Sequence, residues 1–158
     1  MNNLSSIVLT GVGATAITDC WGFARKPLLG IPSPDYGLVG RWLSHMRHGQ
    51  FHHASITASP PVHGEQVSGW VVHYLIGIAY AALLALIGGE AWLHNPTPWL
   101  ALATGIGTVA APFLVMQPAM GAGIAASRMR HPGSARLHSL LMHAVFGIGL
   151  YVSAWALR

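Results

Sequence analysis

Four long stretches of the chain are almost wholly apolar, and shorter polar stretches separate them. The apolar stretches cover about residues 4–24, 66–89, 98–117 and 135–157. A helix that crosses the hydrocarbon core of a bilayer needs about 20 mostly apolar residues. The pattern therefore predicts an all-α membrane protein, with four transmembrane helices in a single domain over residues 1–158.

A long polar loop, about residues 25–65, connects the first two predicted spans. Asp35 can cap a short helix that continues to about Met46. Within it, Leu38 and Trp42 fall on one side together with Met46. We expect this short helix to lie at the cytoplasmic membrane surface, where an amphipathic helix buries its apolar side. Packing against the cytoplasmic ends of the bundle is the alternative.

The positions of the basic residues predict the orientation of the spans. Of the eight Lys and Arg residues, all except Arg158 lie in the loop 25–65, or in or next to the loop between the third and fourth spans. The loop between the second and third spans has none. Cytoplasmic loops carry the excess of Lys and Arg in membrane proteins. We therefore expect a multi-pass protein of a bacterial inner membrane with both termini in the periplasm.

The overall composition supports a membrane protein and excludes several other classes. Charged residues make up 8% of the chain and hydrophobic residues 53%, whereas soluble domains carry roughly 25% charged residues. The formal net charge of +4 is too small for a nucleic-acid footprint. We therefore expect the lipid bilayer, and no nucleic acid, as the partner. A single cysteine, Cys20, excludes an internal disulfide.

Polar side chains interrupt the apolar spans at similar depths. Asp19, His73, Gln117 and His143 come from the four different spans. With a rise of about 1.5 Å per residue, Asp19, His73 and His143 lie roughly 8–12 Å inside the predicted cytoplasmic boundary, and Gln117 ends the third span on the same side. Asp19, His73 and His143 also share helix faces with small residues, which face other helices rather than lipid. The sequence therefore predicts that these four residues form a buried polar cluster. Because ionisable residues inside a membrane are candidate functional groups, this cluster is the candidate site.

Two further residues lie at the edge of the predicted cluster. Glu65 marks the mouth of the second span, and His138 lies one turn shallower than His143. The cluster predicts a site that binds a proton, an ion or a small solute, with transport as one use. Four helices rarely enclose a complete pathway, so transport favours a homo-oligomer.

Two other readings of the cluster stay open. His73 and His143 could be axial haem ligands, or could bind a metal ion together with Asp19, as in a redox protein. Alternatively, the polar groups only join the helices of a membrane scaffold. The chain has no nucleophile elbow, phosphate loop or HExxH zinc motif. No catalytic residue can be assigned, and the sequence favours a non-enzymatic role.

The long loop is rich in histidine. Half of the ten histidines fall in it: His45, His48, His52, His53 and His63. The simplest interpretation is a solvated, irregular loop over about residues 48–61. Imidazole also suits Zn, Cu, Fe and Ni, so a transition-metal site in this loop is the alternative.

Three segments carry a resemblance to a known family. They are Gly30–Trp42 (GIPSPDYGLVGRW), Gly69–Tyr74 (GWVVHY) and Pro112–Gly123 (PFLVMQPAMGAG). The chain resembles the bacterial membrane family known as domain of unknown function 2938, over nearly its whole length. The resemblance implies a small polytopic inner-membrane protein and carries no activity or functional residues with it.

The predicted orientation can be tested with inserted reporters. A reporter that is active only in the cytoplasm should be active when inserted near Gly49 and silent when inserted near Asn95, because the Lys and Arg residues flank the first position. The opposite pattern of activity would overturn the orientation.

Overall fold

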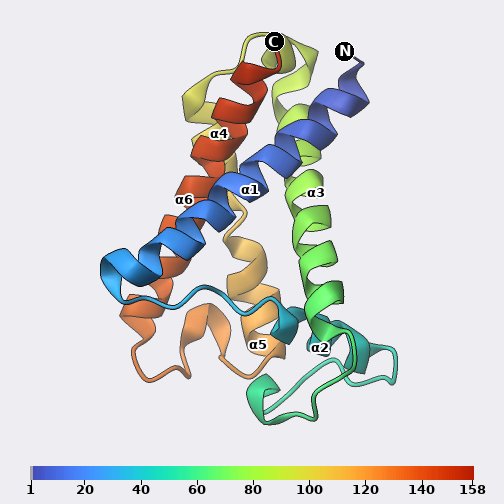
Figure 1. Ribbon diagram of the computed structural model, residues 1–158, viewed down its shortest axis with the longest axis vertical. Helices are drawn as coiled ribbons and strands as arrows, with labels where there is room; N and C mark the ends of the chain where they lie inside the picture. Colours follow the sequence, from blue (N-terminus) through green and yellow to red (C-terminus); the bar gives the residue numbers. More distant parts are fainter. Residues whose placement is uncertain (1) are drawn as a thin grey trace. The chain divides into compact units, whose positions relative to one another are not determined.

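A computed structural model describes residues 2–158, and all regular secondary structure in this part of the chain is helical, without a strand (Figure 1). Its α-helices are α1 (Asn3–Leu29), α2 (Gly37–Met46), α3 (Glu65–His94), α4 (Pro98–Gly107), α5 (Gln117–Ala119) and α6 (Pro132–Ala156). Shorter helical turns cover Ile56–Ala58, Pro112–Met116 and Ile124–Ala126. The predicted all-α fold is confirmed.

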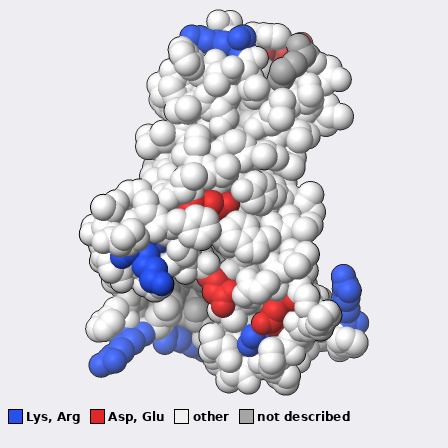
Figure 2. Space-filling view, viewed as in Figure 1, with Lys and Arg blue, Asp and Glu red and all other residues white. Residues whose placement is uncertain are grey.

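Four helical stretches are long and apolar enough to cross a membrane. They are α1, α3, the combined stretch Pro98–Ala119 and α6. Many of their large apolar side chains point away from the protein: Val67 of α3 is 69% exposed and Leu86 is 82% exposed. On the face shown in Figure 2, most of the surface carries neither basic nor acidic atoms. The protein is therefore a multi-pass membrane protein by composition, and its spans imply contact with lipid.

The described residues form two compact units. The first, here the helix unit, takes the chain up to Pro34 together with Tyr74–Thr108 and Leu140–Arg158. The second, here the connector unit, comprises Asp35–His73 and Val109–Ser139. Helices α3 and α6 each contribute residues to both units.

Glycines bring the helices of the helix unit into backbone contact. A Cβ added to Gly11 of α1 would lie 2.6 Å from the Cα of Ile78 in α3. A Cβ on Gly105 of α4 would collide with the backbone of Gly147 in α6, and a Cβ on Gly149 of α6 would lie 2.9 Å from the Cα of Ala14 in α1. The small faces predicted from the sequence around Gly11 and Gly147 are therefore helix contacts.

The core of the helix unit is small and apolar. Leu84 of α3 and Leu150 of α6 are fully buried, and Phe146 is 7% exposed. The ring of Tyr80 meets that of Phe146 edge-on, with centroids 6.0 Å apart. This edge-to-face geometry is favourable for aromatic pairs, and it ties α3 to α6.

Helix α1 is longer than the predicted span. The sequence places its end at Ala24, before the basic pair and Pro27, but the helix continues to Leu29. Pro27 lies in the last turn, where it removes one hydrogen bond without ending the helix. The helix ends at Gly30, whose left-handed φ of 69° and backbone bond to the Lys26 carbonyl form a typical glycine cap.

The third span is not one regular α-helix, because α4 ends at Gly107. Pro112 has no N–H to donate, and the chain passes through a π-helical turn in which the Gln117 N–H donates to the Pro112 carbonyl. Pro118 lies in the first turn of α5, where proline is well tolerated. The helical stretch ends at Ala119, directly after Pro118.

The loop 25–65 contains the short helix that was predicted. Helix α2 begins at Gly37, and the Asp35 carboxylate accepts the Gly37 N–H at 2.9 Å. Asp35 therefore forms an Asx turn directly before this helix, whose N-cap residue is Tyr36. A position of α2 at the membrane surface stays a prediction.

The glycine contacts give a matched pair of substitutions. Gly11→Ala should lower the free energy of unfolding by about 1–3 kcal/mol, because the new methyl group displaces the backbone of α3. Gly107→Ala should cause no loss, because a Cβ there meets nothing within 4 Å. Unfolding in a denaturing detergent, followed by tryptophan fluorescence, measures both. Equal losses in the two variants would contradict the contact at Gly11.

Candidate functional site

The residues that the sequence proposed as a polar cluster belong to both units. Asp19 and His143 lie in the helix unit. The connector unit contains the other four: His73, Gln117, Glu65 and His138. Each group is described within its own unit, and the convergence of all of them on one site stays a prediction.

Asp19 is a buried carboxylate in the apolar helix α1. Its exposed fraction is 7%. The Tyr74 hydroxyl, at the start of the helix-unit part of α3, shares a side-chain hydrogen bond with it. The nearby Thr15 and Thr18 hydroxyls donate instead to carbonyls of their own helix, both at 2.8 Å. Asp19 is thus a buried ionisable group that a phenolic hydroxyl stabilises, as expected for a carboxylate away from water.

His143 is held by a small hydrogen-bonded group between α4 and α6. Its Nδ1 lies 3.0 Å from the Thr108 hydroxyl and 3.2 Å from the Gly105 carbonyl. The Thr108 hydroxyl itself donates to the Gly105 carbonyl at 2.6 Å. Because that hydroxyl hydrogen is already used, Nδ1 is the donor of the imidazole, and Nε2 is left as the acceptor. His143 therefore joins two helices while it keeps one nitrogen able to take a proton.

His73 belongs to an aromatic stack in the connector unit. Its ring lies on the ring of Tyr36, with centroids 3.8 Å apart and planes 19° apart. Trp70 meets both rings edge-on, at 4.8 Å from Tyr36 and 5.9 Å from His73. The stack fixes the start of α3 against the residue that precedes α2, so His73 has a packing role in this unit.

Gln117 and His138 are both half-buried in the connector unit. The Oε1 atom of Gln117 is buried and has no hydrogen-bond partner among residues 2–158. The backbone carbonyl of Gln117 accepts the Ala122 N–H at 2.8 Å, which closes the turn after α5. A buried amide oxygen without a donor is unusual in a folded protein, and it keeps Gln117 among the candidate binding residues.

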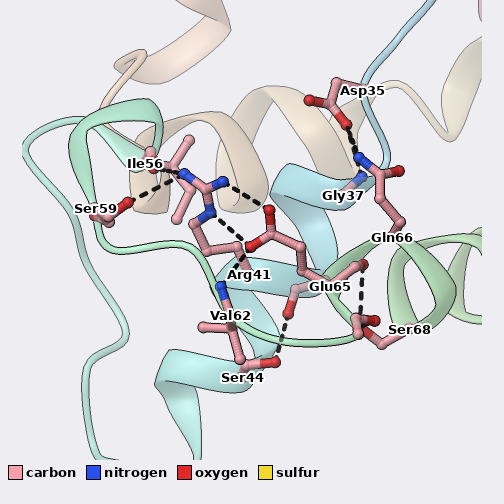
Figure 3. Close-up of polar contacts among 12 residues, drawn as sticks. Asp35, Gly37, Arg41, Ser44, Ile56, Ser59, Val62, Glu65, Gln66 and Ser68 are labelled. Atoms are coloured by element: carbon pink, nitrogen blue, oxygen red, sulfur yellow. Dashed lines mark hydrogen bonds and ion pairs between the residues drawn. The ribbon is translucent and has the colours of Figure 1, made fainter.

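Glu65 has a specific partner that the sequence did not indicate. Its carboxylate receives two bonds from the Arg41 guanidinium, at 2.7 and 2.8 Å, and a third from the Val62 N–H at 2.8 Å (Figure 3). The same guanidinium donates to the carbonyls of Ile56 and Ser59. Arg41 and Glu65 are 24 positions apart, so no local spacing could have revealed the pair.

The Arg41–Glu65 pair, which we call the guanidinium fork, connects three segments. They are α2, the turn at Ile56–Ala58 and the start of α3 (Figure 3). The hydrogen bond to Glu65 raises the pKa of Arg41 above its ordinary value, so the guanidinium stays charged. Two parallel N–H···O bonds have a geometry that lysine cannot reproduce. The role of Glu65 in this unit is therefore to hold the loop against the helix ends.

The hypotheses of a haem site and of a metal site rest on His73 and His143, with Asp19 as a third ligand in the metal site. Among residues 2–158, no group of three or more His, Cys, Asp or Glu side chains is arranged to hold a metal ion. A divalent ion in a protein usually takes at least three protein ligands. Both readings stay hypotheses without a described ligand set.

The guanidinium fork predicts an asymmetry between two arginines of the same region. Arg41→Lys should lower the melting temperature almost as much as Arg41→Ala, because lysine loses the fork and its carbonyl contacts. Arg47→Ala, at an exposed position just after α2, is the control and should leave it unchanged. Melting of the protein in mild detergent, followed by circular dichroism, measures all three. A Lys variant as stable as the parent would show that charge alone suffices.

Comparison with known proteins identifies the family. No curated protein and no solved structure matches the chain. A family profile with the description "Protein of unknown function (DUF2938)" matches residues 8–157, which is nearly the whole chain. This match confirms the resemblance seen in the sequence, and the description names no activity. With four helices able to span a membrane and a match over this range, the chain belongs to the DUF2938 family.

Proposed function

We propose that this protein binds and releases a proton, and through it an ion or small solute, at a polar intramembrane site centred on Asp19. The observation that carries the proposal is the burial of Asp19, only 7% exposed within an apolar helix that can span a membrane. An ionisable residue at such a position is rare and is retained for function more often than for stability.

The surroundings of Asp19 suit a group that changes its protonation state. Removal of a carboxylate from water is costly unless hydrogen bonds replace the lost hydration. The Tyr74 hydroxyl provides such a bond, and it can also accept one from the protonated acid. The site can therefore hold Asp19 in both its charged and its neutral form.

His143 provides a second titratable group in the same unit. Its Nδ1 is anchored by Thr108 and Gly105, and the free acceptor Nε2 can take a proton. A carboxylate and an imidazole on separate helices of one bundle are the parts from which proton relays in membranes are built. We infer that Asp19 is the primary site and that His143 assists it.

The location and assembly follow from the sequence. The bias of Lys and Arg supports an inner-membrane protein with both termini in the periplasm and the site near the cytoplasmic face. Four helices in one chain favour a homo-oligomer for any complete pathway across the membrane. The function proposed here is one of binding and transfer, and no chemical transformation is assigned.

A second function is favoured by the close helix contacts. The glycine contacts at Gly11 and Gly105, and the hydrogen bond between Thr108 and His143, all serve to join helices. A membrane scaffold would need no more than these. The two functions differ in one respect, which is whether Asp19 changes its protonation state within the pH range of a cell.

Infrared difference spectroscopy distinguishes the two functions. The chain contains only four Asp and Glu residues, so single carboxyl bands can be assigned by substitution. We expect a protonated-carboxyl band in the parent protein that is absent in Asp19→Asn. Glu90→Gln, which replaces an exposed carboxylate, is the control and should leave the band in place. A spectrum without such a band, or a band that persists in Asp19→Asn, would favour the scaffold.

Stability measurements on the same variants test the packing of the site. Asp19→Asn should be tolerated better than Asp19→Leu, because the amide keeps the bond to Tyr74. Hydrogen bonds between membrane helices contribute about 0.6 kcal/mol on average, and about 1–2 kcal/mol in model peptides. A difference in this range between the two variants is expected from detergent unfolding. Equal stability of the two variants would mean that the polar contact at Asp19 contributes nothing.

A further inference from the structure

The connection between the third and fourth candidate spans, residues 120–131, lies at the edge of the hydrocarbon core at both of its ends. It follows directly on Ala119, the last residue of the third span, and leads into Pro132, the first residue of the fourth. A segment this short between two spans cannot move far from the level of the lipid headgroups. We call it the arginine loop.

The exposed side chains of the arginine loop are of two kinds. Ile124 is 62% exposed and Met129 is 49% exposed, and the guanidinium groups of Arg128 and Arg130 belong to exposed residues as well. Amphipathic segments at a bilayer surface bury their apolar side chains among the headgroups and keep their basic groups beside the phosphates. The arginine loop has both parts of such a surface.

The backbone of the loop is fixed in an unusual conformation. Ala125 and Ala126 have φ angles of 47° and 59°, a region that a residue with a Cβ rarely adopts. Arg136, at the start of α6, donates from Nε to the Ala125 carbonyl at 2.8 Å, and the Arg128 N–H donates to the Ala122 carbonyl at 2.9 Å. Such a strained turn persists only where its surroundings hold it. A fixed turn loses less entropy when a ligand binds.

No carboxylate of the connector unit is left to neutralise the two exposed arginines of the loop. Residues 91–158 contain no Asp or Glu. The two carboxylates of this unit have partners elsewhere, since Asp35 accepts from the Gln66 amide and Glu65 accepts from Arg41. The positive charge of the loop is therefore available to an external anion. A guanidinium group suits phosphate best, because it can donate two parallel bonds to it.

We propose that the arginine loop binds the phosphate groups of anionic phospholipids and prefers these lipids to zwitterionic ones. Anionic membrane surfaces attract basic side chains next to a span, whereas a zwitterionic headgroup brings a cation that the two guanidinium groups repel. The phosphate belongs to a lipid rather than to a free ion, because Ile124 and Met129 stand beside the arginines and have no use in binding a free ion. These two side chains insert between the lipids and keep Arg128 and Arg130 at the level of the phosphates.

The other basic loop of the connector unit, which follows α2, is packed differently. His53 in this loop is only 6% exposed, so the expectation of a simply solvated histidine loop is wrong at this position. The His53 N–H donates at 2.8 Å to the Ala119 carbonyl of α5. Arg47 is an exposed basic residue of the same loop, and the sequence places it far from the spans on either side. It is therefore a matched control for the arginines beside the spans.

Native mass spectrometry of the full chain in mild detergent tests the proposal. The protein is titrated with dioleoylphosphatidylglycerol and, in parallel, with dioleoylphosphatidylcholine, which has the same acyl chains. Each basic residue near an anionic lipid strengthens binding by about fivefold. We therefore expect the first phosphatidylglycerol molecule to bind more than about tenfold tighter than phosphatidylcholine. The double variant Arg128→Gln/Arg130→Gln should bind both lipids equally.

Three comparisons show whether the loop is the source of the preference. Arg47→Gln should keep the full preference. Where the double variant loses its parent melting temperature, the single variants Arg128→Gln and Arg130→Gln replace it, and each should lower the preference by about fivefold. Inorganic phosphate should displace no more lipid than chloride does at the same ionic strength.

Three results would overturn the proposal. The first is equal affinity of the parent protein for the two lipids. The second is a loss of preference in Arg47→Gln as large as that in the arginine-loop variants. The third is displacement of the lipid by inorganic phosphate beyond the effect of chloride, which would indicate a site for the free anion.

Discussion

The fold depends on one constraint, which is that polar groups in the hydrocarbon core of a bilayer find no water and must be satisfied within the protein. The helices satisfy their own backbone, and the Thr15 and Thr18 hydroxyls return to carbonyls of α1. With these groups satisfied, helices approach through glycine, as Gly11 does against α3. Asp19 and His143 differ from these groups, because Asp19 is paired with Tyr74 of α3 and His143 with Thr108 at the end of α4. Their protonation states can therefore affect the contacts between helices.

The connector unit solves a different problem, which is to order a chain with little regular structure. Arg41 does so with four bonds, two to Glu65 and two to the carbonyls of Ile56 and Ser59. A backbone carbonyl that accepts a hydrogen bond from a guanidinium does not need a partner in a helix or a strand. The loop can therefore be irregular and still have a defined conformation. The burial of His53 is a consequence of this order, since its backbone is bound to α5.

Hydropathy and residue size predicted the parts of the fold that depend on local sequence. The four spans follow from apolar length, and the contacts at Gly11 and Gly147 follow from small residues on one helix face. The π-helical turn that begins at Pro112 was not predicted, because local rules do not show how a helix adjusts around a proline inside a span. The guanidinium fork and the burial of His53 depend on residues far apart in the chain. Candidate residues could thus be named from the sequence, whereas their partners needed the structure.

The ligand proposed for Asp19 follows from the surroundings of this residue. Asp19 lies in an apolar helix, where a divalent ion with a single carboxylate would keep an uncompensated charge away from water. A proton removes the charge of the carboxylate altogether, so it is the ligand that this environment tolerates best. The hydrogen bond with Tyr74 on α3 then replaces part of the hydration that the carboxyl group has lost.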